Sequence, residues 1–209
     1  YYTEAERSAL QLYDTVQKYY GESHQISAFA ALRTAAVYFN SRRFSEARNW
    51  YERALDCLNH CEPFNCKYDR LRVTALYKIA REHQNSGDLK KAWEYLAEAI
   101  AIAQRCAAGA DHRYWNLELT YLYRRAAVLS LAEDRAAADR YLEKMHEAAW
   151  TVATAEQGNP IYEADIGETD AQFLQSSERY EEASAILKRN LLIYEQFRGE
   201  THEDTLHAR

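Results

Sequence analysis

Proline and glycine are scarce in this chain, with two prolines and six glycines among 209 residues. Because these two residues interrupt helices most strongly, their scarcity leaves room for long helices and for little else. A hydrophobic run of about 18 residues is also missing, so the sequence predicts no membrane-spanning segment. The four cysteines form no evident disulfide framework and no signal-peptide pattern opens the chain, which together indicate a cytoplasmic protein.

Acidic residues outnumber basic ones, which gives the chain a formal net charge of −6. That balance argues against a general nucleic-acid binder, although local basic patches remain compatible with it. Aromatic residues, in contrast, make up 13% of the sequence and supply ample apolar surface for a folded core. Disorder is therefore not expected.

A four-residue motif occurs twice in the chain. Residues 21–24 (Gly-Glu-Ser-His) return as residues 199–202 (Gly-Glu-Thr-His), 178 residues later. Between them, five alanines follow one another at intervals of 42, 45, 46 and 45 residues: Ala5, Ala47, Ala92, Ala138 and Ala183. A period in the range of about 20–50 residues indicates stacked repeats rather than one globular core.

Each period divides into two helical segments. We expect one helix over 3–20, then helix pairs over 25–60, 69–107, 112–152 and 159–197, and the start of a further repeat at 201–209. Gly21 is expected to end the first helix in a left-handed cap. Ser45 and Asp88 are expected to cap the helices that follow them, and Asn159 is expected to cap a helix that begins at Pro160. Because the first residue is not Met and the last falls within an expected helix, we interpret the chain as part of a longer protein.

The spacing of small and large residues resembles the tetratricopeptide-repeat pattern, and the long period resembles the repeats of kinesin light chain. The resemblance implies an all-α fold, a right-handed α-solenoid of antiparallel helix pairs, with residues 1–209 as a single array. One departure is Asn190, which stands where alanine is usual. The repeat that contains Arg135 and Met145 also departs from the pattern. The best matches are Ala35, Tyr38, Phe44, Ala47, Tyr51, Ala54 and Leu55 in one copy, and Ala80, His83, Gly87, Leu89, Ala92, Leu96, Ala99 and Ile100 in the next.

In tetratricopeptide arrays the first helix of each pair lines a concave groove, so the resemblance implies a groove here as well. Cationic side chains beside aromatic ones suit an acidic segment with apolar anchors. The alternative interpretation is that the same residues form solvated helix faces. The groove residues predicted by register are Phe29, Arg33, Phe39, Asn40, Tyr77, Lys78, Arg81, Gln84, Asn85, Tyr123 and Arg124.

Some residues resemble parts of known metal-binding or catalytic motifs, but none of these motifs is complete. The densest potential metal ligands are Cys57, His60, Cys61 and Cys66, but their spacing matches no common zinc module, and buried thiols at a repeat junction explain them as well. His146 begins a sequence like that of a zinc-protease helix, yet Trp150 stands where the second histidine would be. We therefore predict no metal site, no cofactor and no catalytic residue.

These patterns predict a protein–protein interaction module that binds a peptide segment or a partner protein in its groove. The alternative is a ligand-sensing array within a larger signalling ATPase or transcription regulator. Neither membrane nor nucleic acid is an expected partner. Open ends of the array provide a route to self-association.

Overall fold

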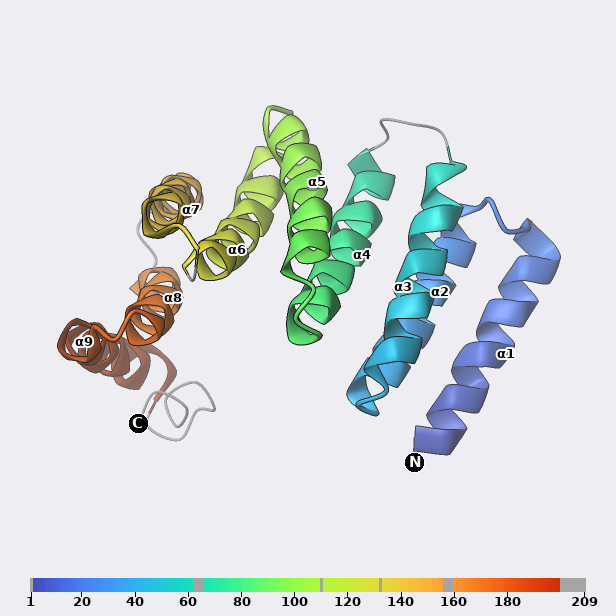
Figure 1. Ribbon diagram of the computed structural model, residues 1–209, viewed down its shortest axis with the longest axis horizontal. Coiled ribbons are helices and arrows are strands. Elements are labelled where there is room, and N and C mark those ends of the chain that lie inside the picture. The colour runs from blue at the N-terminus through green and yellow to red at the C-terminus, as the bar shows by residue number, and fades with distance from the viewer. Residues whose placement is uncertain (1, 62–65, 110, 132, 156–159, 200–209) are drawn as a thin grey trace. The chain divides into compact units, whose positions relative to one another are not determined.

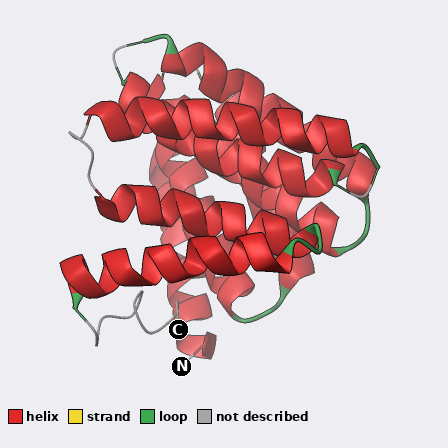
Figure 2. Ribbon diagram, turned by 90° about the vertical axis from the view of Figure 1, so that its left-hand side faces the viewer, coloured by secondary structure: helices red, strands yellow, loops and turns green. Residues whose placement is uncertain are grey.

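The computed structural model describes residues 2–61, 66–109, 111–131, 133–155 and 160–199. All secondary structure in these residues is helical (Figure 2). This confirms the predicted all-α fold of paired helices. The helices are α1 (Tyr2–Tyr20), α2 (Gln25–Asn40), α3 (Phe44–Asn59), α4 (Cys66–Asn85), α5 (Leu89–Ala107), α6 (His112–Ser130), α7 (Arg135–Ala155), α8 (Pro160–Ser176) and α9 (Tyr180–Arg198) (Figure 1).

The chain forms two compact units, Tyr1–Gly109 and Ala110–Arg209. In the first unit, α2 packs against α1, α3 and α4, while α4 also packs against α3 and α5. In the second unit, α6 pairs with α7 and α8 with α9, and α8 also contacts α6 and α7. Within each unit the helices contact those next to them or nearly next to them in the sequence, which is typical of repeat proteins. None of the described helices combines the length and the apolar character that crossing a membrane requires.

Three of the turns between paired helices contain a left-handed residue. Arg42, Gly87 and Glu178 have φ angles of 59°, 83° and 60°, and each lies in the turn before the second helix of a pair. Gly21 has a φ of 81° after α1, as predicted for a left-handed cap. The same reversal of the chain is thus made with glycine at some repeats and without it at others.

Of two predicted helix caps, the structure confirms one and contradicts the other. Asp88 caps α5, because its side chain accepts a hydrogen bond from the Lys91 backbone N–H at 3.2 Å. The prediction that Ser45 caps α3 is wrong, since that helix begins at Phe44 with Arg43 in the capping position. The left-handed residue before Arg43 completes the turn one residue early, so Ser45 already lies within the helix and its hydroxyl hydrogen-bonds the Glu46 carboxylate at 3.1 Å.

Other expected boundaries differ from the structure or lie outside the described residues. The helix expected from residue 69 begins at Cys66, almost one turn earlier. The helix expected to end at 152 extends to Ala155. The predicted cap at Asn159 and the repeat start at 201–209 lie outside the described residues.

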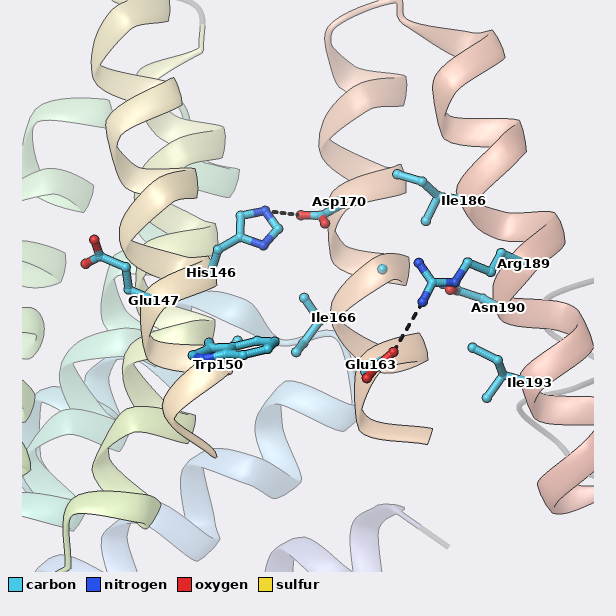
Figure 3. A pocket seen from close by; sticks show the side chains of 12 residues that line it. His146, Glu147, Trp150, Glu163, Ile166, Asp170, Ile186, Arg189, Asn190 and Ile193 are labelled. Carbon is cyan, nitrogen blue, oxygen red and sulfur yellow. Dashed lines mark hydrogen bonds and ion pairs between the residues drawn. The ribbon is translucent and has the colours of Figure 1, made fainter. Parts of the chain in front are cut away.

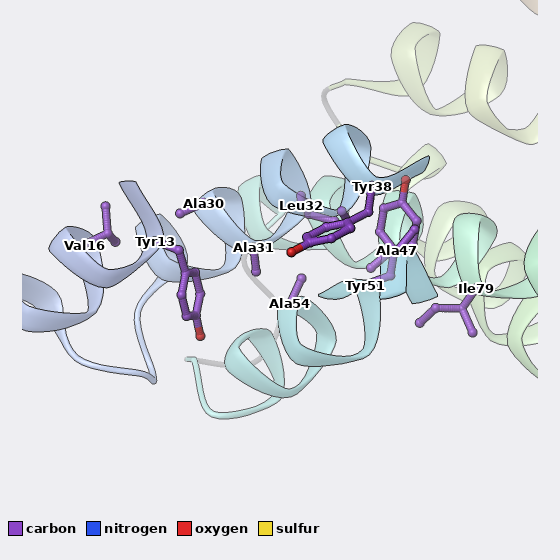
Figure 4. Packing of buried hydrophobic residues seen from close by; sticks show 12 residues of the cluster. Tyr13, Val16, Ala30, Ala31, Leu32, Tyr38, Ala47, Tyr51, Ala54 and Ile79 are labelled. Atoms are coloured by element: carbon purple, nitrogen blue, oxygen red, sulfur yellow. The ribbon is translucent and has the colours of Figure 1, made fainter. Parts of the chain in front are cut away.

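The core of the first unit combines small residues with large aromatic ones (Figure 4). Ala47 and Ala54 on α3 are fully buried, so the backbones of α2 and α3 approach each other closely. Tyr13 and Tyr51 fill the space beside these contacts and are also buried. Native-like packing density requires this alternation of sizes across a helix contact.

The alanines that mark the sequence period are buried in both units. Ala47, Ala92, Ala138 and Ala183 all have relative exposures of at most 1%. Ala5 is exposed, because the only described helix that packs against α1 is α2. The sequence period of these alanines therefore marks the positions at which the two helices of each pair contact each other.

Candidate binding groove

A groove of about 340 Å³ lies between α2 and α4 in the first unit. These are the first helices of two successive pairs, so the groove falls on the helices for which the sequence predicts it. The structure brings five of the predicted residues together there. The lining residues are Phe29, Leu32, Arg33, Ala36, Phe39 and Asn40 on α2, Tyr51 on α3, and Leu71, Thr74 and Lys78 on α4.

The position of these residues on α2 follows from helical periodicity. Phe29, Arg33 and Ala36 are spaced by four and three residues, which places them on one face of a helix. The opposite side of α2 packs into the core through small residues such as Ala31 and Ala35, both fully buried. Phe29 consequently stays 49% exposed, an unusual value for so large an apolar side chain in a folded repeat.

Cationic side chains surround the aromatic rings of the groove. The Arg81 guanidinium carbon lies 4.0 Å from the centre of the Phe39 ring, and Lys78 Nζ lies 5.7 Å from the same centre. The Arg33 guanidinium carbon lies 5.9 Å from the centre of the Phe29 ring. Among the described residues that line the groove there is no carboxylate, so its potential is positive despite the acidic net charge of the chain.

Arg81 contributes to the groove indirectly. Its side chain is 20% exposed, and its Nε lies 3.6 Å from the carboxylate of buried Glu82. Burial raises the pKa of Glu82, and the Arg81 charge opposes that shift. Arg81 packs against the ring of Phe39, which lines the groove, and does not line the groove itself.

Tyr51 closes the floor of the groove between the two helices. It is 3% exposed, and burial raises its pKa to about 12, with the nearby Arg81 charge opposing the shift. The phenol therefore stays neutral at physiological pH and leaves the charge of the groove to Arg33 and Lys78.

The remaining predicted groove residues lie elsewhere. Tyr77 and Gln84 are partly buried on α4, and Asn85 is exposed at its end. Tyr123 and Arg124 belong to the second unit, where Tyr123 is 6% exposed and Arg124 hydrogen-bonds the Gln172 side chain. Within the first unit, Tyr77, Gln84 and Asn85 do not line the α2–α4 groove.

Sequence reasoning missed the apolar members of the groove. Leu32 and Leu71 line the groove from α2 and α4, and Tyr51 lines it from α3, although the sequence identifies Tyr51 only as a match to the repeat pattern. Leu71 lies three residues before Thr74 and seven before Lys78, so helical spacing from Lys78 identifies it. That signal also requires the knowledge that α4 packs against α2, which the spacing along α4 alone does not give.

The cysteine cluster does not assemble a metal site among the described residues. No group of three or more histidine, cysteine or acidic side chains in that part of the chain is arranged to hold a metal ion. Burial raises the pKa of both Cys57 and Cys61, and the Cys61 thiol donates to the Cys57 carbonyl at 3.3 Å. The Cys66 side chain lies outside the described residues.

Comparison with known proteins identifies the repeat and the fold. Residues 34–59, which span the end of α2 and all of α3, match the model of the tetratricopeptide repeat family. No curated protein sequence matches the chain. The match to solved structures is, however, extensive.

Two similar structures represent that match. The nearly identical TPR-like repeats of a candidate kinesin light chain from Podosopora anserina superpose with a TM-score of 0.60 at 15% identity, covering 93% of this chain and 88% of that one. BtubC (BKLC) from P. vanneervenii superposes with a TM-score of 0.69 at 14% identity, covering 99% of this chain and 78% of that one. Residues 34–59 thus match the tetratricopeptide repeat family, and the chain has the fold of the kinesin-light-chain-like tetratricopeptide-repeat proteins.

Proposed function

We propose that this chain is a protein–protein interaction module whose α2–α4 groove binds an extended acidic segment of a partner protein. The observation that carries the proposal is the groove itself, in which Phe29 and Phe39 are accompanied by Arg33 and Lys78 and by no described carboxylate. The tetratricopeptide-repeat fold supports a scaffold role in general terms. The acidic character of the segment is inferred from the charge of the groove.

The groove suits a short segment better than a folded domain. Its volume of about 340 Å³ lies near the lower end of the range for ligand pockets, about 300–1,000 Å³, and holds one or two side chains. An apolar side chain of the partner packs against Phe29, Leu32 and Leu71, while flanking carboxylates pair with Arg33 and Lys78. The exposed carboxamide of Asn40 offers both a donor and an acceptor to the partner backbone.

Fluorescence anisotropy with labelled peptides tests this proposal. The probe is a nonapeptide with a central phenylalanine flanked by glutamates, and its matched comparison has lysines in place of the glutamates. We expect binding of the glutamate peptide alone, with an affinity that falls as salt is raised because exposed charges are screened. Equal binding of the two peptides would contradict the proposed electrostatic complementarity.

Paired charge reversals locate the interaction. Arg33→Glu with Lys78→Glu is expected to weaken binding of the glutamate peptide by about tenfold or more, since attraction becomes repulsion on both sides of the groove. Arg7→Glu with Lys90→Glu makes the same change in net charge at exposed positions on α1 and α5 that do not line the groove. If both double variants weakened binding equally, net charge rather than the groove would account for it.

A further inference from the structure

A cavity of about 550 Å³ lies entirely within the second unit, between α7, α8 and α9 (Figure 3). It is larger than the α2–α4 groove, and its volume falls within the range of small-molecule sites, about 300–1,000 Å³. It therefore has room for a small organic molecule, and the chemistry of its walls indicates which class of molecule fits.

The apolar surface of the cavity comes from all three helices. Trp150 on α7 is 69% exposed, and Figure 3 shows its ring next to Ile166 of α8. Ile186 and Ile193 contribute from α9. An indole beside branched aliphatic side chains favours a flat aromatic ligand, because an aromatic ring stacks on the indole in addition to burying apolar area.

The charged side chains that face the cavity are paired with one another across the helices. Glu163 of α8 lies 3.2 Å from Arg189 of α9. Asp170 Oδ1 of α8 lies 3.1 Å from His146 Nε2 of α7, and this hydrogen bond raises the pKa of His146, so at mildly acidic pH the imidazole is protonated and balances the carboxylate. Figure 3 shows the carboxylate of Glu147, which also borders the cavity, pointing away from it. The described walls of the cavity therefore offer a ligand no unbalanced charge.

One uncharged polar side chain also lines the cavity. Asn190 on α9, where the repeat pattern has alanine, is 3% exposed and donates a hydrogen bond from Nδ2 to the Ala164 carbonyl at 2.8 Å. That is its only hydrogen bond among the described residues, whereas a carboxamide can donate two and accept two. A buried carboxamide oxygen without a partner is costly, so Asn190 Oδ1 suits a hydrogen-bond donor from outside the chain.

Gly167 on α8 makes this acceptor accessible. A Cβ at Gly167 would lie 2.7 Å from Asn190 Oδ1, so the missing side chain leaves a gap over the oxygen. Because Gly167 and Asn190 both line the cavity, the oxygen is within reach of a molecule bound there. A glycine inside a helix costs stability, and this gap is what the glycine provides in return.

We propose that this cavity binds an uncharged aromatic molecule that carries a hydroxyl or another hydrogen-bond donor. The aromatic body packs against Trp150 and the isoleucines, and the donor bonds to Asn190 Oδ1. A charged ligand would lose hydration against the apolar surface and would find only charges that are already paired. Such a site gives the array a small-molecule ligand in addition to a peptide, and it does not rest on the groove proposal.

Three probes that share a naphthalene ring and differ in charge test the proposal: 2-naphthylmethanol, 2-naphthylmethylammonium and 2-naphthoate. Binding is followed by NMR at about pH 6, where His146 is protonated, through the indole and carboxamide N–H signals of uniformly labelled protein. The Trp150 and Asn190 signals are assigned by their loss in Trp150→Phe and Asn190→Ala. We expect 2-naphthylmethanol to shift both signals with one Kd of about 1 mM or below, a value within reach of a ligand of this size. We expect both charged probes to bind several-fold more weakly.

Two variants of α9 test the role of the carboxamide. Asn190→Ala is expected to weaken binding of 2-naphthylmethanol several-fold, measured on the Trp150 signal, because the hydroxyl loses its acceptor. Gln196→Ala removes a carboxamide from an exposed position of the same helix that does not line the cavity, and it is expected to leave the affinity unchanged. Alanine is the usual residue of the repeat pattern at position 190, so the fold is expected to be retained. The comparison of the three probes uses the unaltered protein and therefore tests the proposal even if Asn190→Ala is unstable.

The proposal would be overturned by no shift of the Trp150 signal with any probe, by equal affinity for all three probes, or by tighter binding of a charged probe. Equal loss of affinity in the two alanine variants would also overturn it. A shift caused by either nonapeptide of the groove assay but not by 2-naphthylmethanol would overturn it as well and would identify the cavity as a protein-docking surface. The groove assay uses residues of the first unit and another probe, so either proposal can fail without the other.

Discussion

Gly167 and Asn190 fit together so closely that a Cβ on Gly167 would lie 2.7 Å from Asn190 Oδ1 and 2.9 Å from its Nδ2. Gly167→Ala is therefore expected to destabilise the second unit, although alanine is the better helix former at an isolated position. Forcing the methyl group in displaces the Asn190 amide from its hydrogen bond with Ala164. The expected loss is about 1–3 kcal/mol, measured by denaturant unfolding.

The double variant distinguishes this clash from a general effect on α8. In Gly167→Ala combined with Asn190→Ala, the two small side chains restore the contact that the repeat pattern favours. We expect the double variant to be more stable than Gly167→Ala alone, which gives a large coupling energy in a double-mutant cycle. Additive losses would show that the two residues act independently.

Asp69 anchors a buried polar cluster in the first unit. It is 2% exposed and lies 3.0 Å from Arg72 Nη1, 3.4 Å from Arg105 Nη2 and 3.4 Å from the Cys106 thiol. Arg72 in turn donates to the Leu58 carbonyl, so the cluster links α3, α4 and α5. Asp69→Ala leaves the buried Arg72 charge without its partner and is expected to cost about 3–5 kcal/mol in unfolding experiments. Asp56→Ala, at an exposed position of α3, is expected to cost far less.

The sequence was sufficient to predict the helix pairs because the relevant signals are local. The buried alanines at 47, 92, 138 and 183 mark successive pair contacts, and a spacing of four residues places Phe29 and Arg33 on one face of α2. The groove face followed from the resemblance to tetratricopeptide arrays. The prediction of the helix pairs, in contrast, required only periodicity and register.

Contacts between helices far apart in sequence were beyond such reasoning. Arg81 packs against Phe39, 42 residues earlier, and the register of α4 alone does not predict this contact. Asn190 was recognised as a departure from the pattern, yet its counterpart Gly167 is identifiable only when α8 and α9 are placed together. The cavity beside this pair combines side chains from residues 146 to 193, and no sequence spacing connects them.

His83 is expected to make the first unit sensitive to mild acid. Its side chain is 4% exposed and stacks on the Tyr95 ring. Burial lowers the pKa of His83, and the charges of Arg48 and Lys91 lower it further, whereas those of Asp88 and Glu52 oppose the shift. The unfolded chain takes up a proton near pH 6.5 while the folded protein resists it, so stability is fully present above that pH and falls as the pH drops. His83→Phe keeps an aromatic ring but no titrating group. It is expected to flatten the decline of unfolding free energy between pH 7 and 5, whereas His60→Asn at an exposed position is expected to leave it unchanged.

His146 is expected to act in the opposite direction in the second unit. Its hydrogen bond with Asp170 raises its pKa, although burial works against the shift. The folded protein therefore holds a proton that the unfolded chain releases near pH 6.5, so the stabilisation is fully present below that pH and is lost as the pH rises through the folded pKa. An NMR titration of the imidazole measures the pKa directly, and Asp170→Asn is expected to lower it. In unfolding experiments, His146→Asn is expected to remove the alkaline decline while His112→Asn, exposed on α6, retains it. An unchanged His146 pKa in Asp170→Asn would show that the 3.1 Å contact does not stabilise the charged form.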